Sequence, residues 1–146
     1  MPAAFRDSEP MRKINFTAIA LGCLADWAGT AAFSLIFAMF AVSVETSHGM
    51  RTEQAVDFLR QWSQTPAGAL FSMLFGLCFT GLGGYVAARI SKQETLINSA
   101  SIGGIAVLGG LPLLSNVPAA GVIISMALSI PAAVLGGFFY TRKFTL

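Results

Sequence analysis

The chain has 146 residues, of which 55% are hydrophobic and only 11% are charged, and its formal net charge is +2. A soluble domain carries about 25% charged residues, so this chain has too little polar surface to face water on all sides. The length fits one compact domain, and so small a charge argues against a nucleic-acid partner, which leaves the lipid bilayer as the expected surroundings.

The first apolar run, residues 15–44, is long enough to cross a bilayer and contains a single charged residue, Asp26. About 20 apolar residues are enough for a span. A carboxylate at mid-membrane costs about 3 kcal/mol on insertion scales, so Asp26 should face protein, water or a partner. The run is longer than a span needs, so its depth stays open. A span beginning at Ile14 puts Asp26 near mid-depth, and one beginning near Leu21 puts it close to the cytoplasmic end.

Asp26 has two interpretations. In the functional one, its carboxylate couples transport to a proton or a cation. In the structural one, it forms an ion pair with Arg89 or accepts hydrogen bonds from Thr30, Ser34 or a neighbouring helix. Arg89 ends the second apolar run on the cytoplasmic side, where arginine also anchors to headgroups, so the ion pair requires a shallow Asp26.

A short amphipathic helix is predicted over residues 52–64, in the first outer connection. Thr52 can cap this helix, and Glu53 places negative charge in its first turn. The helix either lies at the outer membrane surface with Trp62 at headgroup level, or packs against the ends of the spans. Its apolar residues recur at helical spacing and are Ala55, Val56, Phe58, Leu59 and Trp62.

Three further spans are predicted at residues 67–90, 96–114 and 118–140. None of them alternates apolar with polar residues, which excludes the strands of a membrane barrel. The predicted fold is therefore all-α: a polytopic membrane protein with four transmembrane helices arranged as two hairpins, plus the amphipathic helix.

Capping residues and prolines divide the second half of the chain. Ser115 and Asn116, followed by Pro118, indicate a tight turn between the last two spans. Pro112 and Pro131 lie inside apolar stretches, and each should kink its helix because proline removes a backbone hydrogen bond.

The second and fourth predicted spans repeat one another at an offset of 53 residues. Leu82-Gly83-Gly84 falls on Leu135-Gly136-Gly137, and Arg89 falls on Arg142. Both spans would run from outside to inside, so they should be parallel. This predicts two related hairpins about an axis along the membrane normal.

Each repeat carries small side chains at every fourth position, and the first span shows the same spacing from Ala18 to Ser34. Small residues let helices approach closely in lipid, where the hydrophobic effect does not drive them together. Both stripes are therefore predicted to form helix contacts. Their main members are Gly68, Ser72, Gly76, Thr80 and Gly84 in the second span, and Gly121, Ser125 and Gly137 in the fourth.

Lysine and arginine are unequally divided between the two sides of the membrane. With the amino terminus inside, seven of them fall in cytoplasmic segments and only Arg51 and Arg60 fall outside. Positive residues favour the cytoplasm, so both termini are predicted to lie there.

No set of residues suited to catalysis or cofactor binding is evident. Gly81-x-Gly83-Gly84 is similar to a phosphate-binding loop but lies within a predicted span and follows no strand, so packing explains it. His48 and Glu45 offer two possible metal ligands, and a lone histidine in a polar loop is usually solvated. We expect no enzyme activity, cofactor or metal.

Two short motifs resemble a loose group of small bacterial four-helix membrane proteins of unknown function. The motifs are Asp26 followed by Gly29-Thr30, and Gly83-Gly84-Tyr85-Val86-Ala87-Ala88-Arg89-Ile90. The resemblance rests on the first two spans, roughly half the chain. It implies a four-helix fold in the bacterial plasma (inner) membrane and supplies no activity.

The sequence thus favours a small integral membrane protein that works by packing, as an accessory subunit or an oligomeric scaffold. Its expected partners are the lipid bilayer and either further copies of the chain or a larger membrane complex. The alternative is a small proton- or cation-coupled transporter or channel that uses Asp26.

Overall fold

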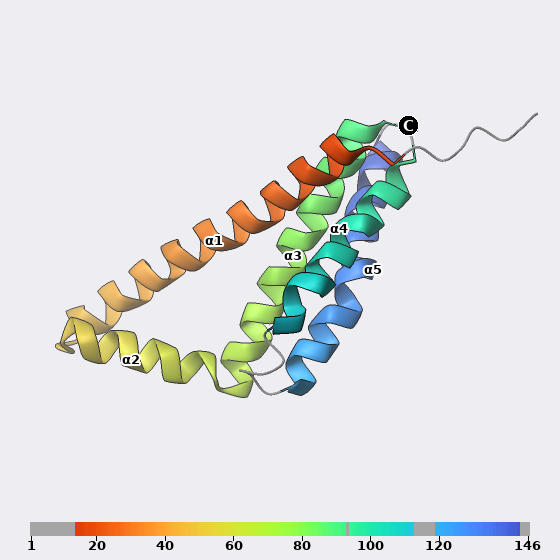
Figure 1. Ribbon diagram of the computed structural model, residues 1–146. Helices are drawn as coiled ribbons and strands as arrows, with labels where there is room; N and C mark the ends of the chain where they lie inside the picture. Colours follow the sequence, from red (N-terminus) through yellow and green to blue (C-terminus); the bar gives the residue numbers. More distant parts are fainter. Residues whose placement is uncertain (1–13, 93, 113–118, 144–146) are drawn as a thin grey trace, which may run out of the picture.

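The computed structural model describes residues 14–92, 94–112 and 119–143. Every regular element in these ranges is helical (Figure 1). The α-helices are α1 (Phe16–Ser47), α2 (Thr52–Ser63), α3 (Pro66–Ser91), α4 (Thr95–Gly110) and α5 (Ala119–Lys143). Helices α1, α3 and α5 are long and apolar enough to cross a membrane, whereas α4 is a shorter apolar helix. The all-α prediction is confirmed, and three of the four predicted spans correspond to helices of spanning length.

The end of α4 differs from the prediction. The α-helix ends at Gly110, and Leu111 and Pro112 form a short 3-10 turn, so Pro112 does not lie inside the helix as predicted. Residues 113 and 114 of the predicted span fall outside the described residues. Proline donates no backbone hydrogen bond and its ring crowds the preceding turn, so it follows the helix instead of bending it. Pro131 does lie inside α5. The predicted turn at residues 115–118 falls outside the described residues.

The start of α2 also differs in detail. Arg51 occupies the N-cap position, and its backbone N–H donates to the side-chain oxygen of Gln54 at 3.2 Å. Thr52 is therefore the first helical residue and not the cap, and the side chain of Gln54 satisfies the backbone N–H of Arg51. Glu53 lies in the first turn as predicted.

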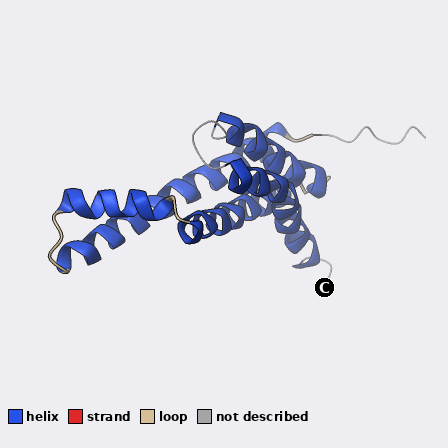
Figure 2. Ribbon diagram, turned by 90° about the horizontal axis from the view of Figure 1, so that it is seen from below, coloured by secondary structure: helices blue, strands red, loops and turns tan. Residues whose placement is uncertain are grey.

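Helices α1 and α3 form an antiparallel pair that is closed at one end and open at the other. Near the start of α1, a Cβ atom placed on Gly22 would lie 2.8 Å from the carbonyl oxygen of Gly83, so the two backbones touch. The helices then diverge, and α2 bridges the gap between the end of α1 and the start of α3 (Figure 1). Figure 2 shows the turn between α1 and α2 projecting away from the other helices.

Helices α3, α4 and α5 form the closely packed part of the molecule. Ser99 of α4 lies against Gly137 of α5, and Gly103 lies against Ile130. Rising numbers in α4 thus meet falling numbers in α5, which makes these two helices antiparallel. Helices α3 and α5 run in the same direction, as their colours show in Figure 1. The expectation that the two repeats are parallel is met by this arrangement.

The repeated glycines nevertheless meet different neighbours. Gly84 of α3 faces the backbone of Ala133 in α5, whereas its counterpart Gly137 has Ser99 of α4 as its nearest neighbour. The nearest neighbours of the two glycines therefore differ, although both positions use a small residue for close approach.

Buried polar groups tie α4 to its neighbours. The backbone N–H of Asn15 donates to the side-chain oxygen of Asn98 at 2.9 Å, and the side chain of Asn15 caps α1. The hydroxyl of Ser99 bonds the carbonyl oxygen of Gly84 in α3 at 2.8 Å. Asn98 and Ser99 are fully buried, so these bonds fix the end of the bundle at which α1 and α4 begin.

Candidate functional site

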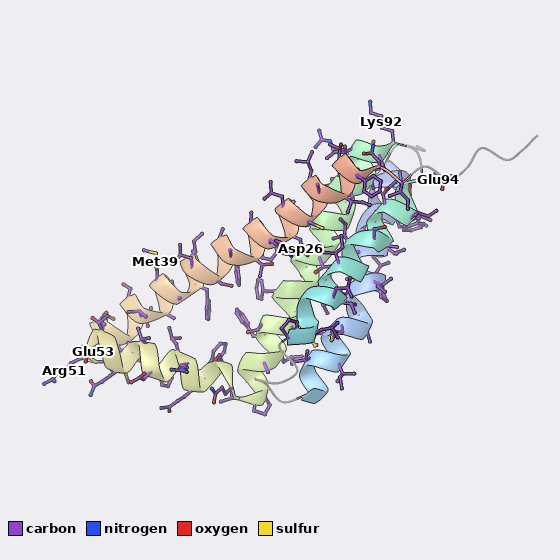
Figure 3. All side chains as sticks on the ribbon, in the orientation of Figure 1. Asp26, Met39, Arg51, Glu53, Lys92 and Glu94 are labelled. Carbon is purple, nitrogen blue, oxygen red and sulfur yellow. The ribbon has the colours of Figure 1, made fainter. Side chains whose placement is uncertain are left out.

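Asp26 is buried between α1 and α3, with 6% of its surface exposed. Figure 3 shows it on the side of α1 that faces α3. Its one hydrogen-bond donor among the described residues is the hydroxyl of Thr80, which lies 3.4 and 3.5 Å from the two carboxylate oxygens. The same hydroxyl lies closer, at 3.1 Å, to the carbonyl oxygen of Gly76. One hydroxyl proton cannot serve all three acceptors, so the carboxylate is weakly satisfied.

Arg89 does not compensate the charge of Asp26. Within the described part of the chain Asp26 forms no salt bridge, and Arg89 is exposed. Arg89 follows Thr80 by nine residues on α3, which is about 13 Å along the helix axis at 1.5 Å per residue. The structure therefore brings Asp26 to Thr80 and keeps it from Arg89. Of the structural interpretations, the hydrogen bond to a neighbouring helix is the one observed.

The height of Asp26 in the bundle follows from the position of Thr80. Helix α3 has 26 residues, and Thr80 is near its middle. Asp26 lies ten residues from the start of α1, about 15 Å along that helix. Both helices place the carboxylate well away from their ends.

Beyond Asp26, aromatic rings line the space where α1 and α3 diverge. Phe33 of α1 stacks on Phe75 of α3 with ring centroids 4.1 Å apart, and Phe37 meets Phe71 at 4.9 Å. Trp62 of α2 completes the group, 5.6 Å from Phe71. Trp62 thus contacts the spans, so of the two interpretations of α2 the structure shows packing against their ends. We call the space between α1, α2 and α3 the aromatic wedge; its rings are Phe33, Phe37, Trp62, Phe71, Phe75 and Phe79.

The aromatic wedge contains a cavity of about 280 Å³. Its inner end is lined by Thr30, four residues after Asp26 on α1, and by Gly76, four residues before Thr80 on α3. One helical turn, about 6 Å, therefore separates the cavity lining from the Asp26–Thr80 pair. The residues that line the cavity include no charged side chain. The site is thus a mostly apolar cavity, and the carboxylate of Asp26 lies about one helical turn beyond its inner end.

The predicted packing residues divide into those that touch another helix and those that do not. Gly84 faces α5, Gly137 faces α4, and Gly68 faces the backbone of Trp62 in α2. Gly121 has no neighbour within 4 Å of an added Cβ atom. Ser125 accepts a bond from Ser129 of its own helix through its carbonyl oxygen. The other three, Ser72, Gly76 and Thr80, lie at the cavity or beside Asp26.

The aromatic wedge was not predicted from the sequence, although a signal for it is present. Phe71, Phe75 and Phe79 recur every four residues, and Phe33 and Phe37 share this spacing on α1. Such a stripe marks one face of a helix. Phenylalanine is common in spanning helices, and the spacing alone does not indicate that the rings of α1 and α3 contact one another.

Metal ligands do not gather in the described ranges, where no three side chains of His, Cys, Asp or Glu are close enough to hold an ion. Comparison with known protein families, curated proteins and solved structures finds no match for this chain. The resemblance of its two motifs to small bacterial membrane proteins therefore stays a prediction.

Proposed function

We propose that this is a protein of the bacterial plasma membrane with four spans and both termini in the cytoplasm. The direction of the helices supports this count. If α3 and α5 both cross the bilayer in the same direction, α4 must carry the chain back between them. The 16 residues of α4 rise about 24 Å, less than the roughly 30 Å hydrocarbon core, a mismatch that local thinning can absorb.

Cysteine labelling tests this topology. In a protein with Cys23→Ala and Cys78→Ala, an impermeant maleimide should modify His48→Cys in intact cells and spare Lys92→Cys until the cells are opened. His48 follows the last residue of α1 and Lys92 follows the last residue of the antiparallel helix α3, so the two lie at opposite ends of this pair. Equal labelling of both in intact cells would contradict the proposed arrangement.

We further propose that Asp26 binds a proton or a monovalent cation as part of a transport or channel activity. The observation that carries this proposal is a carboxylate buried near mid-bundle that has, among the described residues, no counter-charge and one shared hydroxyl donor. A charged carboxylate within a membrane span has a high free-energy cost unless a cation or a proton neutralises it, and the described residues provide no cation. Thr80 orients the carboxylate towards α3.

Flux through proteoliposomes tests the role of Asp26. The purified protein is reconstituted around a trapped pH indicator, and a sodium or potassium gradient is imposed. We expect the gradient to move protons across wild-type vesicles and Asp26→Asn vesicles to show only the leak of empty liposomes. Asparagine keeps the shape of the side chain but cannot exchange a proton. Identical traces for wild type and Asp26→Asn would remove the coupling role.

A second candidate function, as an accessory subunit or oligomeric scaffold, is favoured by a different observation. Gly104 and Gly109 of α4 have no neighbour within 4 Å of an added Cβ atom. Small residues without a partner inside one chain are suited to close approach by a helix of another chain. Leucine at Gly104 has room within the chain, so Gly104→Leu should leave the monomer folded.

Purification from native membranes tests this second function. An accessory subunit should bring a stoichiometric partner, and a scaffold should migrate as an oligomer. Gly104→Leu should release the partner or dissociate the oligomer. A monomeric wild-type protein without a partner would contradict this function and leave the proposal for Asp26 standing.

A further inference from the structure

The aromatic wedge and Asp26 together specify one kind of ligand. Six aromatic rings from three helices line the cavity, and the face of an aromatic ring carries negative electrostatic potential. Cations bind over such faces, and quaternary ammonium groups are the ligands for which aromatic cages are best suited. The described lining residues include no lysine or arginine that would repel such a cation.

Charge complementarity points to the same ligand. An ammonium group at the inner end of the cavity, beside Thr30 and Gly76, would lie about one helical turn from the carboxylate of Asp26. Opposite charges attract strongly over such a distance away from water. An anion in this position would face both the acid and the ring faces, and a neutral molecule would leave the acid without a partner.

The size of the cavity limits how large this cation can be. Sites for drug-sized ligands have volumes of about 300–1,000 Å³, and this cavity of about 280 Å³ lies at their lower end. It therefore fits a small cation with one ring or a few alkyl groups. Thr30 and Gly76 leave space at the inner end, since a Cβ atom added to Gly76 would meet nothing within 4 Å.

We propose that the aromatic wedge is a binding site for a small lipophilic monocation of the quaternary or aryl ammonium class, with Asp26 as its counter-charge. This inference rests on the cation-binding role proposed for Asp26 and names the substrate class. Trp62 and Phe75 hold the apolar part of the ligand, and the ammonium group lies towards Asp26.

Equilibrium binding to the full chain in lipid nanodiscs tests the site directly. The chain has two tryptophans, Trp27 and Trp62, so Trp27→Phe leaves Trp62 as the reporter inside the wedge. Benzyltrimethylammonium is titrated while the fluorescence of Trp62 is recorded. Its neutral isostere neopentylbenzene, in which carbon replaces the charged nitrogen, serves as the matched ligand control. We expect a saturable change with benzyltrimethylammonium and at least ten-fold weaker binding of the isostere.

Three variants assign the binding to named residues. Asp26→Asn should weaken benzyltrimethylammonium binding at least ten-fold while leaving the isostere unchanged. Phe75→Ala should weaken both ligands. Phe139→Ala removes an exposed ring of α5 that does not line the cavity, and it should change neither. Each variant, including the Trp27→Phe parent, is checked for a single symmetric peak in size-exclusion chromatography, and the comparison of the two ligands in that parent needs no further substitution.

The outcomes separate this site from the proposed transport role. Absence of saturable binding, equal affinity for the charged and neutral ligands, or unchanged affinity in Asp26→Asn would each overturn the site. An apolar cavity occupied by lipid would give the second of these results. Specific binding to vesicles that show no coupled flux would uphold the site and remove only the transport activity.

Discussion

The two ends of the α1–α3 pair show how side-chain size sets the distance between helices in this molecule. At one end Gly22 meets Gly83 and the backbones touch. At the other end Phe33 meets Phe75 and Phe37 meets Phe71, so a pair of rings separates the backbones. The same two helices therefore make a closed contact and an open wedge. The transition between them falls at Asp26 and Thr80.

The two ends of the α1–α3 pair contribute differently to stability and to function. Apolar surface gains little from leaving lipid for a helix interface, so stability must come from close packing and interhelical hydrogen bonds. The glycine end provides both, because Ser99 also bonds the carbonyl oxygen of Gly84 there. The aromatic end provides ring contacts and a cavity, which can be filled. Substitutions should therefore affect the two ends differently.

The largest effect is expected at the contacts of α5. A Cβ atom on Gly84 would collide with the backbone of Ala133, and one on Gly137 would collide with Ser99. Gly84→Leu and Gly137→Leu should each destabilise the fold by about 3 kcal/mol, because the backbone of Ala133 cannot move aside easily and Ser99 is fully buried. Thermal unfolding in detergent measures this loss. Leu82→Ile and Leu135→Ile, on exposed faces of the same helices, should change stability by less than about 1 kcal/mol. Equal tolerance at all four positions would mean that the glycines are incidental.

A smaller effect is expected where α1 touches α3. An added Cβ atom on Gly22 would lie 2.8 Å from both the carbonyl oxygen of Gly83 and the side chain of Ile102. Gly22→Ala should cost about 1–3 kcal/mol, because the two helices must separate slightly. Gly76→Ala, in the wedge on α3, adds the same methyl group where nothing lies within 4 Å. It should be neutral or stabilising by up to about 1 kcal/mol, from helix propensity. If Gly76→Ala proved as costly as Gly22→Ala, the wedge would be closed in the folded protein.

The smallest effect on stability is expected from the rings. Phe75→Ala removes its ring contacts with Phe33 and Phe71, and each ring pair contributes about 0.5–1.5 kcal/mol. In lipid the transfer free energy that makes such truncations costly in water is largely missing, so the total loss of stability should stay below about 2 kcal/mol. The control is Phe139→Ala on the exposed face of α5, which should have no measurable effect. A loss comparable to that of Gly84→Leu would show that the rings, and not the glycines, hold the bundle together.

Residue patterns predicted the helices but not the way they are arranged. Length and apolarity located α1, α3 and α5, and the spacing of Ala55, Leu59 and Trp62 located α2. The stripe of small residues on α3 was predicted as one contact surface. It instead meets α2 at Gly68, opens on the cavity at Gly76 and meets α5 at Gly84. A stripe at every fourth position turns slowly around a helix, so one helix can offer it to several neighbours.

The partner of Asp26 could not be chosen from the sequence, because the depth of α1 relative to α3 was open. A ten-residue shift along α1 moves a side chain by about 15 Å, which is enough to exchange Arg89 for Thr80 as the nearest polar group. That register is set by the contact of Gly22 with Gly83 and by the bond from Asn15 to Asn98. Both are tertiary contacts without a local sequence signal.

Access to the wedge is the most direct test of the account. In the Cys23→Ala, Cys78→Ala background, Gly76→Cys places a thiol in the cavity, and Ser129→Cys places one at a buried position between α4 and α5. A small cationic thiosulfonate reagent added from outside should modify Gly76→Cys much faster than Ser129→Cys. Benzyltrimethylammonium should slow that reaction, because it and the cationic reagent would occupy the same cavity of the aromatic wedge. Equally slow modification of the two thiols would contradict an open aromatic wedge, because it would mean that α1 packs closely against α3 in the membrane.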